Sequence, residues 1–431
     1  MQKLNSRKPL LDQRGVKQAG KNVMPNEPVL NSFFYENFNI RPKILSKDTC
    51  NICDELRVQL INANRRGQNV SDIQEKKRMH LSQAETARSQ MKADINLSKT
   101  SEDIECITFD MEKTLPLPRL QTNLIFYKRQ LWFYNLGVHS GHTGQSYCYT
   151  WVEGVAGRGA QEVGSCLMKH IRENVKPSVK HLILWSDSCG GQNRNIKIIL
   201  LMKSVLEVNP NLETITFKYL MPGHSYLPND KDFGDIEKGL KFNQQLYTPE
   251  EYREVLRLCR RNKPLILYEM DSEQFYSCEN IENKITNRKK FIDKKPVNWL
   301  RTRQIKLQKV DPFLIYMRSD FQTEEYECLN IQKKSTHRTS TNQVITRQSC
   351  RRPRNVENEN KEVFSFNNLL TPLWPNGKTI AQPKLVDIRS LLHLIPNDAH
   401  QFYDALTGST EIVDDVDGLN SNLDFELEDL E

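Results

Sequence analysis

The chain has 431 residues, with 61 Lys and Arg against 54 Asp and Glu and a net charge of +7. Residues 409–431 hold nine acids and no base, so 61 basic residues face 45 acidic ones in the remainder, or +16. No apolar run approaches the roughly 20 residues of a membrane-spanning helix, and the first residues lack the apolar core of a secretory signal. We therefore expect an intracellular chain with no membrane partner, whose basic body binds a polyanion; DNA is the default partner and the nucleus its location.

The N-terminal part of the chain predicts an arm followed by helices. Residues 1–46 are rich in Pro, Asn and Lys with little periodicity, which indicates a flexible arm. Residues 47–100 have helical periodicity, with a break near Gly67 that predicts a helical hairpin. An apolar stripe marks the face of the second helix that packs inward: Met79, Ala84, Ala87 and Met91.

The helical region opens with two cysteines whose spacing suggests a metal. Cys50 and Cys53 form a C-x-x-C pair, and His80 follows downstream. Zinc prefers four nitrogen or sulfur ligands, so these three residues are candidates for part of a zinc site. A fourth ligand is not evident from spacing, although three other residues could serve: Cys106, His139 and His142. The alternative is a helix start with two incidental thiols.

The segment 101–247 predicts the core of the protein. Its elements follow in the order strand, strand, strand, helix, strand, helix, strand, helix, and the first three strands suit an antiparallel meander. The run 181–187 is almost continuously apolar, as expected for a central strand covered on both faces. This order is that of the RNase H-like fold. We therefore predict an α/β protein whose core is a mixed five-stranded sheet with helices on both faces.

The remainder of the chain predicts smaller parts around this core. Residues 248–327 alternate helix and short strand signals, which indicates an α+β appendage carrying a small sheet. Polar and basic residues at 328–365 are typical of a linker, and helical periodicity returns at 366–406. The acidic tail, 407–431, is expected to be disordered and could compete with DNA for the basic surfaces.

Acidic residues occur where an RNase H-like fold places a two-metal site. Asp110 ends the first strand and Asp187 ends the fourth, which is its neighbour in that fold. A third carboxylate should come from the last helix, where we favour Asp230 and keep Glu237 as a substitute. Such a site would hold Mg²⁺ or Mn²⁺ for cleavage of a phosphodiester. The alternative is that the acids merely terminate strands.

Residues near these acids are candidates for contacts with nucleic acid. Gly190 and Gly191 would let the backbone approach a phosphate near a helix N-terminus. The alternative is a turn with positive φ at the glycines and Asn193 as the N-cap of the helix. Further donors follow in this segment: Gln192, Asn193 and Arg194. Lys128 and Arg129 alternate with aromatics on the second strand and could contact the backbone of a nucleic acid, although charged residues at the rim of a sheet are usually just solvated. His224 could shuttle a proton or orient a carboxylate, or could simply bond to backbone in a turn.

Four motifs in fixed order carry a resemblance to a known family. They read FDMEKTLPLP, YKRQLWFYNLGVH, WSDSCGGQNRN and PGHSYLPNDKDFGDIEK. The chain resembles a large family of uncharacterised, transposon-derived proteins whose shared domain of unknown function is RNase H-like. The resemblance implies a DDE/D-type transposase ancestor in which Asp110, Asp187 and Asp230 hold Mg²⁺ for DNA strand cleavage and transfer. Such proteins usually carry a longer Cys-rich region before the C-x-x-C pair, so we expect a fragment or a copy that has lost its DNA-recognition part.

Three functions follow from these patterns. The first is a divalent-metal-dependent DNA nuclease or strand transferase. The second is a domesticated, non-catalytic module that binds nucleic acid or protein, and the third is a nuclease acting on RNA–DNA hybrids. We expect DNA as the partner and leave a homo-oligomer open.

Overall fold

The computed structural model describes residues 50–286, 289–333 and 364–409. The predicted N-terminal arm, most of the predicted linker and most of the acidic tail lie outside these ranges. Two helices open the described chain, α3 (Asn51–Arg65) and α4 (Ser71–Thr100). None of the helices in the described ranges is both long enough and apolar enough to cross a membrane.

Strands and helices then alternate along the chain, as the sequence predicts for the core. The elements are β1 (Ile104–Met111), β2 (Leu115–Leu117), η1 (Asn123–Tyr127), β3 (Leu131–Ser140), β4 (Ser146–Val152), α5 (Ala160–Asn174), β5 (His181–Ser186), α6 (Ile196–Val208), β6 (Thr214–Tyr219) and α7 (Pro228–Phe242).

Shorter elements complete the described chain. They are α8 (Pro249–Leu258), β7 (Ile266–Glu269), η2 (Ser272–Gln274), β8 (Tyr276–Ser277), α9 (Glu279–Lys284), β9 (Gln304–Gln308), β10 (Leu314–Arg318), β11 (Glu327–Asn330), η3 (Asn367–Leu369), β12 (Thr371–Pro372), β13 (Ile380–Ala381), α10 (Gln382–Arg389), η4 (Leu392–Leu394), η5 (Asn397–Ala399), α11 (His400–Asp404) and β14 (Gly408–Ser409).

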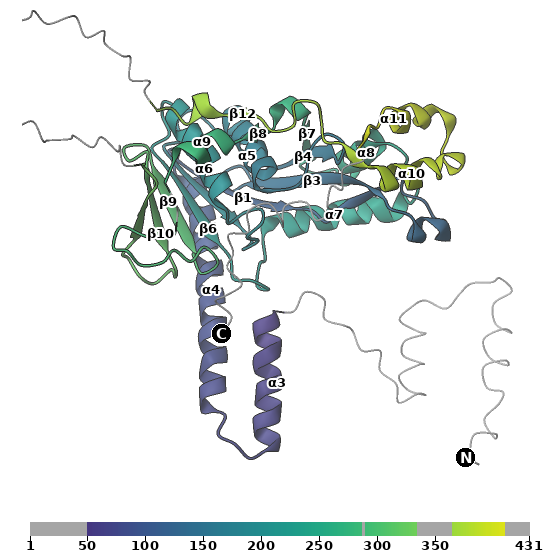
Figure 1. Cartoon of the computed structure of the whole chain (residues 1–431). Coiled ribbons are helices and arrows are strands. Elements are labelled where there is room, and N and C mark those ends of the chain that lie inside the picture. The colour runs from purple at the N-terminus through teal and green to yellow at the C-terminus, as the bar shows by residue number, and fades with distance from the viewer. Residues whose placement is uncertain (1–49, 287–288, 334–363, 410–431) are drawn as a thin grey trace, which may run out of the picture. The chain divides into compact units, whose positions relative to one another are not determined.

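One large mixed sheet organises the fold (Figure 1). Its strand order is β11-β10-β9-β6-β5-β1-β3-β4-β7, and β2 pairs with β3 as a tenth strand. β1, β3 and β4 form the predicted antiparallel meander, whereas β5 and β6 run parallel to β1. The predicted α/β class, the mixed sheet and the N-terminal helices are confirmed.

The sheet is larger than the five strands predicted from the sequence. β9 pairs antiparallel with β6, and β7 pairs with β4, so strands assigned to a separate appendage extend the main sheet at both edges. An unpaired edge strand exposes a row of backbone N–H and C=O groups, and these additions cover β6 and β4. The appendage therefore does not form a sheet of its own.

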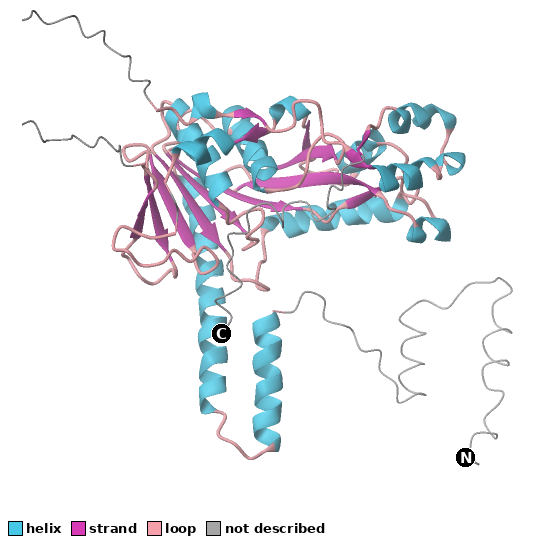
Figure 2. Ribbon diagram, viewed as in Figure 1, coloured by secondary structure: helices cyan, strands magenta, loops and turns pink. Residues whose placement is uncertain are grey.

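Helices cover both faces of this sheet (Figure 2). α5 and α6 bury apolar side chains against one face, together with residues of β1, β5 and β6. On the other face, α7 and α8 pack over β3 and β4, and the C-terminal helices α10 and α11 join that cluster. β5 is buried from both sides, because Leu182 and Leu184 contribute to the first cluster and Trp185 to a smaller one with α4.

α4 is fixed to the sheet through a polar anchor. The carboxylate of Asp94 accepts a hydrogen bond of 2.8 Å from Trp185 Nε1 and pairs with Lys218 Nζ at 2.7 Å. Ala84, Ala87 and Met91 are buried as the apolar stripe predicts. Two details differ from the prediction, because Met79 is 53% exposed whereas the neighbouring His80 is buried.

Candidate metal centre and acidic site

Four possible metal ligands from three separate segments converge beside the start of α3. Cys50 is the N-cap of α3 and Cys53 lies in its first turn, His80 comes from α4, and His224 comes from the connection between β6 and α7. The four ligand atoms all lie within 4.8 Å of one another. Within the described part of the chain, no other group of three or more Cys, His, Asp or Glu side chains is as compact.

The distances within this cluster suit a tetrahedral zinc site. Cys50 Sγ lies 3.2 Å from His80 Nε2, Cys53 Sγ lies 3.4 Å from His224 Nε2, and the two Nε2 atoms are 3.1 Å apart. A tetrahedron with Zn–N of about 2.0–2.1 Å and Zn–S of about 2.3 Å has edges of about 3.3–3.8 Å. Two Nε2 atoms that face each other can both direct lone pairs at a cation, whereas without one they share a single proton at best.

The lowered pKa values of His80 and His224 agree with binding of a zinc ion. Burial, together with the neighbouring His224 and Arg303, lowers the pKa of His80. Burial and the cation of Arg88 lower the pKa of His224. Zinc binds the neutral imidazole, which these environments favour. The possible metal site predicted from Cys50, Cys53 and His80 is thus supported, and His224 is the fourth candidate ligand; the structure places His224 in this cluster rather than beside a carboxylate.

A glycine turn brings His224 to the cysteines. The backbone N–H of His224 donates to the carbonyl of Met221 at 2.9 Å, and Gly223 has φ of +72°. Pro222 followed by glycine with positive φ is the pattern of a type II turn. A methyl group at Gly223 would lie 2.5 Å from Cys50 Cα, so this turn also needs glycine for its close approach to α3.

Replacing Gly223 by alanine should therefore weaken zinc binding. The positive φ costs an L-residue roughly 1–2 kcal/mol, and the contact with backbone of Cys50 cannot be relieved by a side-chain rotation. We expect the zinc dissociation constant of Gly223→Ala, measured by competition with a chromogenic chelator, to rise at least about tenfold. Gly234→Ala is the matched control, since a Cβ at Gly234 meets nothing within 4 Å. Equal zinc affinity of the two variants would contradict the proposed turn geometry.

The predicted catalytic acids lie where two central strands end. β1 and β5 are parallel neighbours, so Asp110 near the end of β1 and Asp187 directly after β5 lie at the same end of these strands, which we call the acidic edge of the sheet. Asp230, at the start of α7, joins them electrostatically: burial first, and then the charges of Asp187 and Asp230, raise the pKa of Asp110 to about 8. Asp187 and Asp230 thus lie close enough to Asp110 to act on its ionisation.

Backbone hydrogen bonds orient each of the three carboxylates. Asp110 accepts from the N–H of Met111 at 2.9 Å, Asp187 from Cys189 at 3.0 Å and Asp230 from Leu227 at 3.0 Å. Asp187 also accepts from the side-chain amide of Asn193. Within the described residues, neither Asp110 nor Asp187 forms a salt bridge. Among the described residues, these three carboxylates are less tightly grouped than the four ligand atoms of the Cys/His cluster.

The other acids of α7 have different partners. Glu237 forms an ion pair with Lys113, and Asp235 pairs with Lys238 at 3.0 Å. Asp232 is buried between Arg260 and His139. Of the two carboxylates left open by the sequence, the structure couples Asp230 to Asp110 and pairs Glu237 elsewhere.

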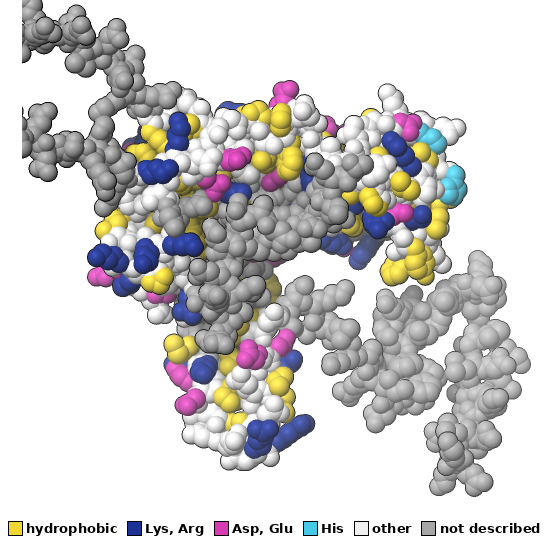
Figure 3. All heavy atoms as spheres, viewed as in Figure 1, with side chains coloured by type: hydrophobic (Ala, Val, Ile, Leu, Met, Phe, Trp, Pro, Cys, Tyr) yellow, Lys and Arg dark blue, Asp and Glu magenta, His cyan; other side chains and the backbone are white. Residues whose placement is uncertain are grey.

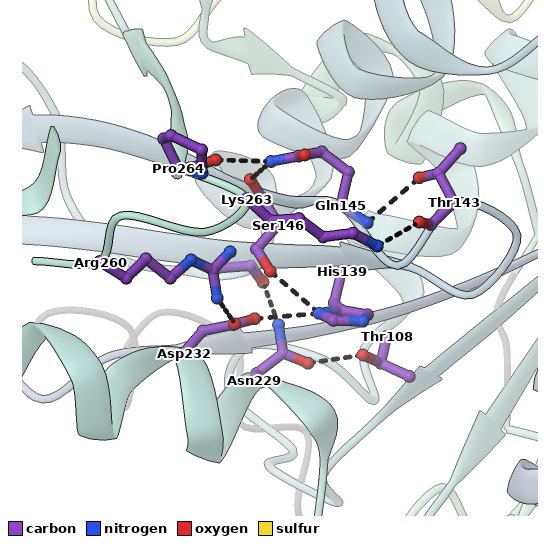
Figure 4. A network of polar contacts seen from close by, with 11 residues as sticks. Thr108, His139, Thr143, Gln145, Ser146, Asn229, Asp232, Arg260, Lys263 and Pro264 are labelled. Atoms are coloured by element: carbon purple, nitrogen blue, oxygen red, sulfur yellow. Dashed lines mark hydrogen bonds and ion pairs between the residues drawn. The ribbon is translucent and has the colours of Figure 1, made fainter.

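Asp232 belongs to a buried polar network that superficially resembles a hydrolytic triad (Figure 4). Asp232 Oδ2 and Ser146 Oγ both lie 3.0 Å from the same nitrogen of His139, Nδ1. A Ser-His-Asp triad uses the two different ring nitrogens, one for each partner. Burial opposes ionisation of Asp232, but hydrogen bonds from His139, Ser146 and Arg260 lower its pKa overall. This network therefore anchors α7 on β3 and β4 and does not activate a nucleophile.

The loop after β5 matches neither a turn with positive φ at the glycines nor a loop in which all the predicted donors are free to bind phosphate. Neither Gly190 nor Gly191 has positive φ, and the side chain that caps α6 belongs to Asn195 and not to Asn193. Arg194 is only 3% exposed and donates to the carbonyls of Ser188 and Thr302. Because Asn193 binds Asp187 and Arg194 is buried, these two side chains shape the loop. Gln192 donates to the carbonyl of Arg158 at 3.0 Å.

The two bases proposed for the second strand lie just before β3. Lys128 and Arg129 both pair with Asp387 of α10, at 3.3 Å and 2.8 Å. Arg129 stays more than half exposed, with 56% of its side chain accessible. They line a groove together with Arg158 and Trp132, residues that sequence reasoning did not single out.

Comparison with known proteins matches part of the chain to a family model. Residues 129–307, from just before β3 into β9, match the model described as "Domain of unknown function (DUF7869)". The matched range includes Asp187, His224 and Asp230, and leaves out Asp110 and the C-x-x-C pair. No curated protein and no solved structure matches the chain.

Proposed function

We propose that the chain is a transposon-derived, DDE/D transposase-like protein whose sheet edge binds divalent cations and cleaves or transfers DNA strands. Asp110, Asp187 and Asp230 are the proposed ligands of Mg²⁺ or Mn²⁺. The observation that carries the proposal is that Asp110 and Asp187 lie at the same end of the parallel neighbours β1 and β5, with Asp230 close enough to help raise the pKa of Asp110.

The strand order supports this proposal. The middle of the sheet reads β4-β3-β1-β5-β6, with antiparallel pairing from β4 to β1 and parallel pairing from β1 to β6. This is the arrangement expected of an RNase H-like core, in which a carboxylate on the first strand and one after the fourth are neighbours. A fold by itself does not determine a reaction. The proposal therefore depends on the three carboxylates, and the strand order gives additional support.

The chemistry of the donors fits the proposed ions. Carboxylate oxygens are hard ligands that suit Mg²⁺ and Mn²⁺, and a cation would offset the repulsion that raises the pKa of Asp110. Bound ions would supply Lewis acidity for the phosphoryl oxygen and a site for the attacking water. The chain itself supplies oriented oxygens, because a backbone N–H holds each of the three carboxylates.

The Cys/His cluster has a separate, structural role in this proposal. Four protein ligands leave no open position for a substrate, as in structural zinc sites. The cluster joins α3 and α4 to the loop that leads into α7, and Asp230 lies six residues beyond His224. Zinc would therefore fix the approach of the third carboxylate to the sheet edge.

A second candidate is a non-catalytic module that keeps the fold and binds nucleic acid or protein. It is favoured by one observation, namely that the three carboxylates are less compact than the Cys/His cluster. The two functions differ in whether the protein cuts what it binds.

Cleavage of labelled DNA in Mg²⁺ or Mn²⁺ tests the proposal. We expect wild-type protein to nick DNA and Asp187→Asn to lose at least about a hundredfold in rate, since metal-ion catalysis supplies several kcal/mol. The asparagine keeps a carbonyl oxygen for the bonds from Cys189 and Asn193, so the loop should survive. Asp235→Asn, which removes only an ion pair with Lys238, should cleave like wild type.

Two results would decide against cleavage by these residues. Wild-type protein that binds DNA without ever cutting it would establish the non-catalytic alternative. Equal cleavage by wild type and Asp187→Asn would assign the activity to another site or to a contaminant.

A further inference from the structure

A groove beside the acidic edge combines cations with aromatic side chains. It has a volume of about 470 Å³ and is lined by residues that include Phe126, Lys128, Arg129, Trp132, Arg158 and Lys384. We refer to it as the basic groove. Its walls come from residues 114–134, which include η1 and the start of β3, from the loop after β4 and from α10, so three separate parts of the sequence build it.

The charge of the basic groove is positive after its ion pairs are considered. Asp387 pairs with both Lys128 and Arg129, and Glu153 pairs with Lys384 at 2.7 Å. Four cations and two carboxylates leave two positive charges. The guanidinium of Arg158 makes no hydrogen bond or ion pair with any side chain or backbone group of the described ranges, so it is available to an anion.

Two exposed aromatic rings lie at the groove: Phe126 lines it and Tyr127 contacts Phe126. Phe126 is 84% exposed and Tyr127 is 79% exposed, and their rings meet edge to face with centroids 5.4 Å apart. Figure 3 shows hydrophobic side chains projecting next to basic ones at the end of the body that carries α10. Trp132 is half-buried and also lines the groove, and Lys384 Nζ lies 5.9 Å from its ring centre.

We propose that the basic groove binds an unpaired stretch of nucleic acid, with bases stacked on the aromatic rings and phosphates held by Arg158 and its neighbours. Every base has an aromatic face, and stacking on side chains beside cations is the usual way in which proteins hold single strands. In a duplex those faces are covered by neighbouring bases. The aromatic rings therefore distinguish a single strand from a duplex, which the charges alone would not.

The basic groove lies close to Asp110 and to the loop after Asp187. Thr114 of its lining is four residues beyond Asp110, so their Cα atoms are at most about 14 Å apart. On the other side, Gln192 of the loop after Asp187 donates to the carbonyl of Arg158. A strand held in the groove would thus extend toward the carboxylates within a few nucleotides. This part of the inference rests on the proposed function, whereas binding in the groove does not.

Fluorescence anisotropy with labelled oligonucleotides, without added Mg²⁺ or Mn²⁺, tests the inference. We expect single strands to bind at least about tenfold more tightly than a duplex of the same sequence, with affinity that falls as salt rises. Phe126→Ala/Tyr127→Ala should lose about tenfold for the single strand and little for the duplex. Arg158→Gln should weaken both and reduce the dependence on salt by about one phosphate contact.

Matched controls exist elsewhere on the surface. Val310→Ala removes an apolar side chain that is also 84% exposed, and Arg172→Gln removes an exposed arginine paired with Glu173. Both controls should bind like wild type. Circular dichroism and the melting temperature of each variant verify folding, which the exposure of Phe126 and Tyr127 should leave intact.

Other outcomes overturn the inference. Equal affinity for single strand and duplex, unchanged in the aromatic variant, would mean that charge alone binds the polyanion. A glutamate-rich peptide that competes as well as DNA, with the aromatic variant again unaffected, would indicate an acidic protein partner. Because no cleavage is measured, a protein that binds single strands here but never cuts them would uphold the groove while refuting the nuclease.

Discussion

Wild-type protein is expected to contain one zinc ion per chain, and His224→Ala is expected to contain none. The imidazole of His224 is one of four converging ligands, and it alone connects the cluster to the segment before α7. Apparent binding free energies of structural zinc in small domains are about 10–16 kcal/mol, so losing a ligand should destabilise the fold by several kcal/mol. For a body of this size the melting temperature should fall by about 10 °C.

Metal analysis of the purified protein and thermal unfolding measure this result. His142→Ala is the matched control, because His142 bonds to the carbonyl of Ser98 and lies outside the cluster. Should His224→Ala fail to fold, release of one equivalent of zinc from wild type by a strong chelator gives the same information. Full zinc content in His224→Ala, or none in wild type, would contradict the assignment.

Asp110→Asn is expected to stabilise the protein in the absence of divalent cations. The pKa of Asp110 is about 8 in the fold, against an ordinary value of 3.8. At pH 7 the unfolded carboxyl is ionised while the folded one holds a proton, which costs the native state up to about 4 kcal/mol. A neutral amide avoids most of this cost. Part of the gain in stability is lost if the N–H₂ group of the amide finds no acceptor.

The sign of this effect fixes its pH dependence. A carboxyl whose folded pKa is raised has no stability cost below its unfolded pKa, so wild type and Asp110→Asn should be alike near pH 4. The difference should grow from about pH 4 to about pH 8 and then remain constant. Urea unfolding over this range measures it, with Asp235→Asn as a surface control that should track wild type.

Divalent cations should narrow the difference in stability between Asp110→Asn and wild type. Mg²⁺ at ten times its dissociation constant adds about 1.4 kcal/mol to a protein that binds it at one site. Wild type should gain this stabilisation and Asp110→Asn should not. A variant that is less stable than wild type at every pH would mean that the carboxyl of Asp110 makes favourable contacts in the fold.

The sequence predicts the centre of the fold because its signals there are local. The apolar run of β5 and the alternation of β1 depend on their own residues, and both strands lie where the pattern indicates. The pairing of β9 with β6 depends on which edge is left uncovered, and neither strand encodes its partner in its own periodicity. The extension of the sheet therefore could not be read from the sequence.

For the candidate sites too, residues close in sequence could be predicted, whereas residues that the fold brings together could not. Cys50 and Cys53 are close in sequence, so their spacing suggests a metal, whereas His224 lies 171 residues from Cys53 and is brought near by the turn at Gly223. Asp230 and Glu237 share a helical face, which left both open. Seven residues of helix are about 10 Å long, so only the acid at the N-terminus of α7 reaches the edge that bears Asp110.

Crystals soaked in Mn²⁺ and measured for anomalous scattering test whether these carboxylates bind a metal ion. We expect anomalous density between Asp110 and Asp187, with Asp230 within coordinating distance, and no such density in Asp187→Asn. Manganese bound only elsewhere, or absent from this edge at concentrations that saturate cleavage assays, would contradict the proposal that these three carboxylates form a metal-dependent site.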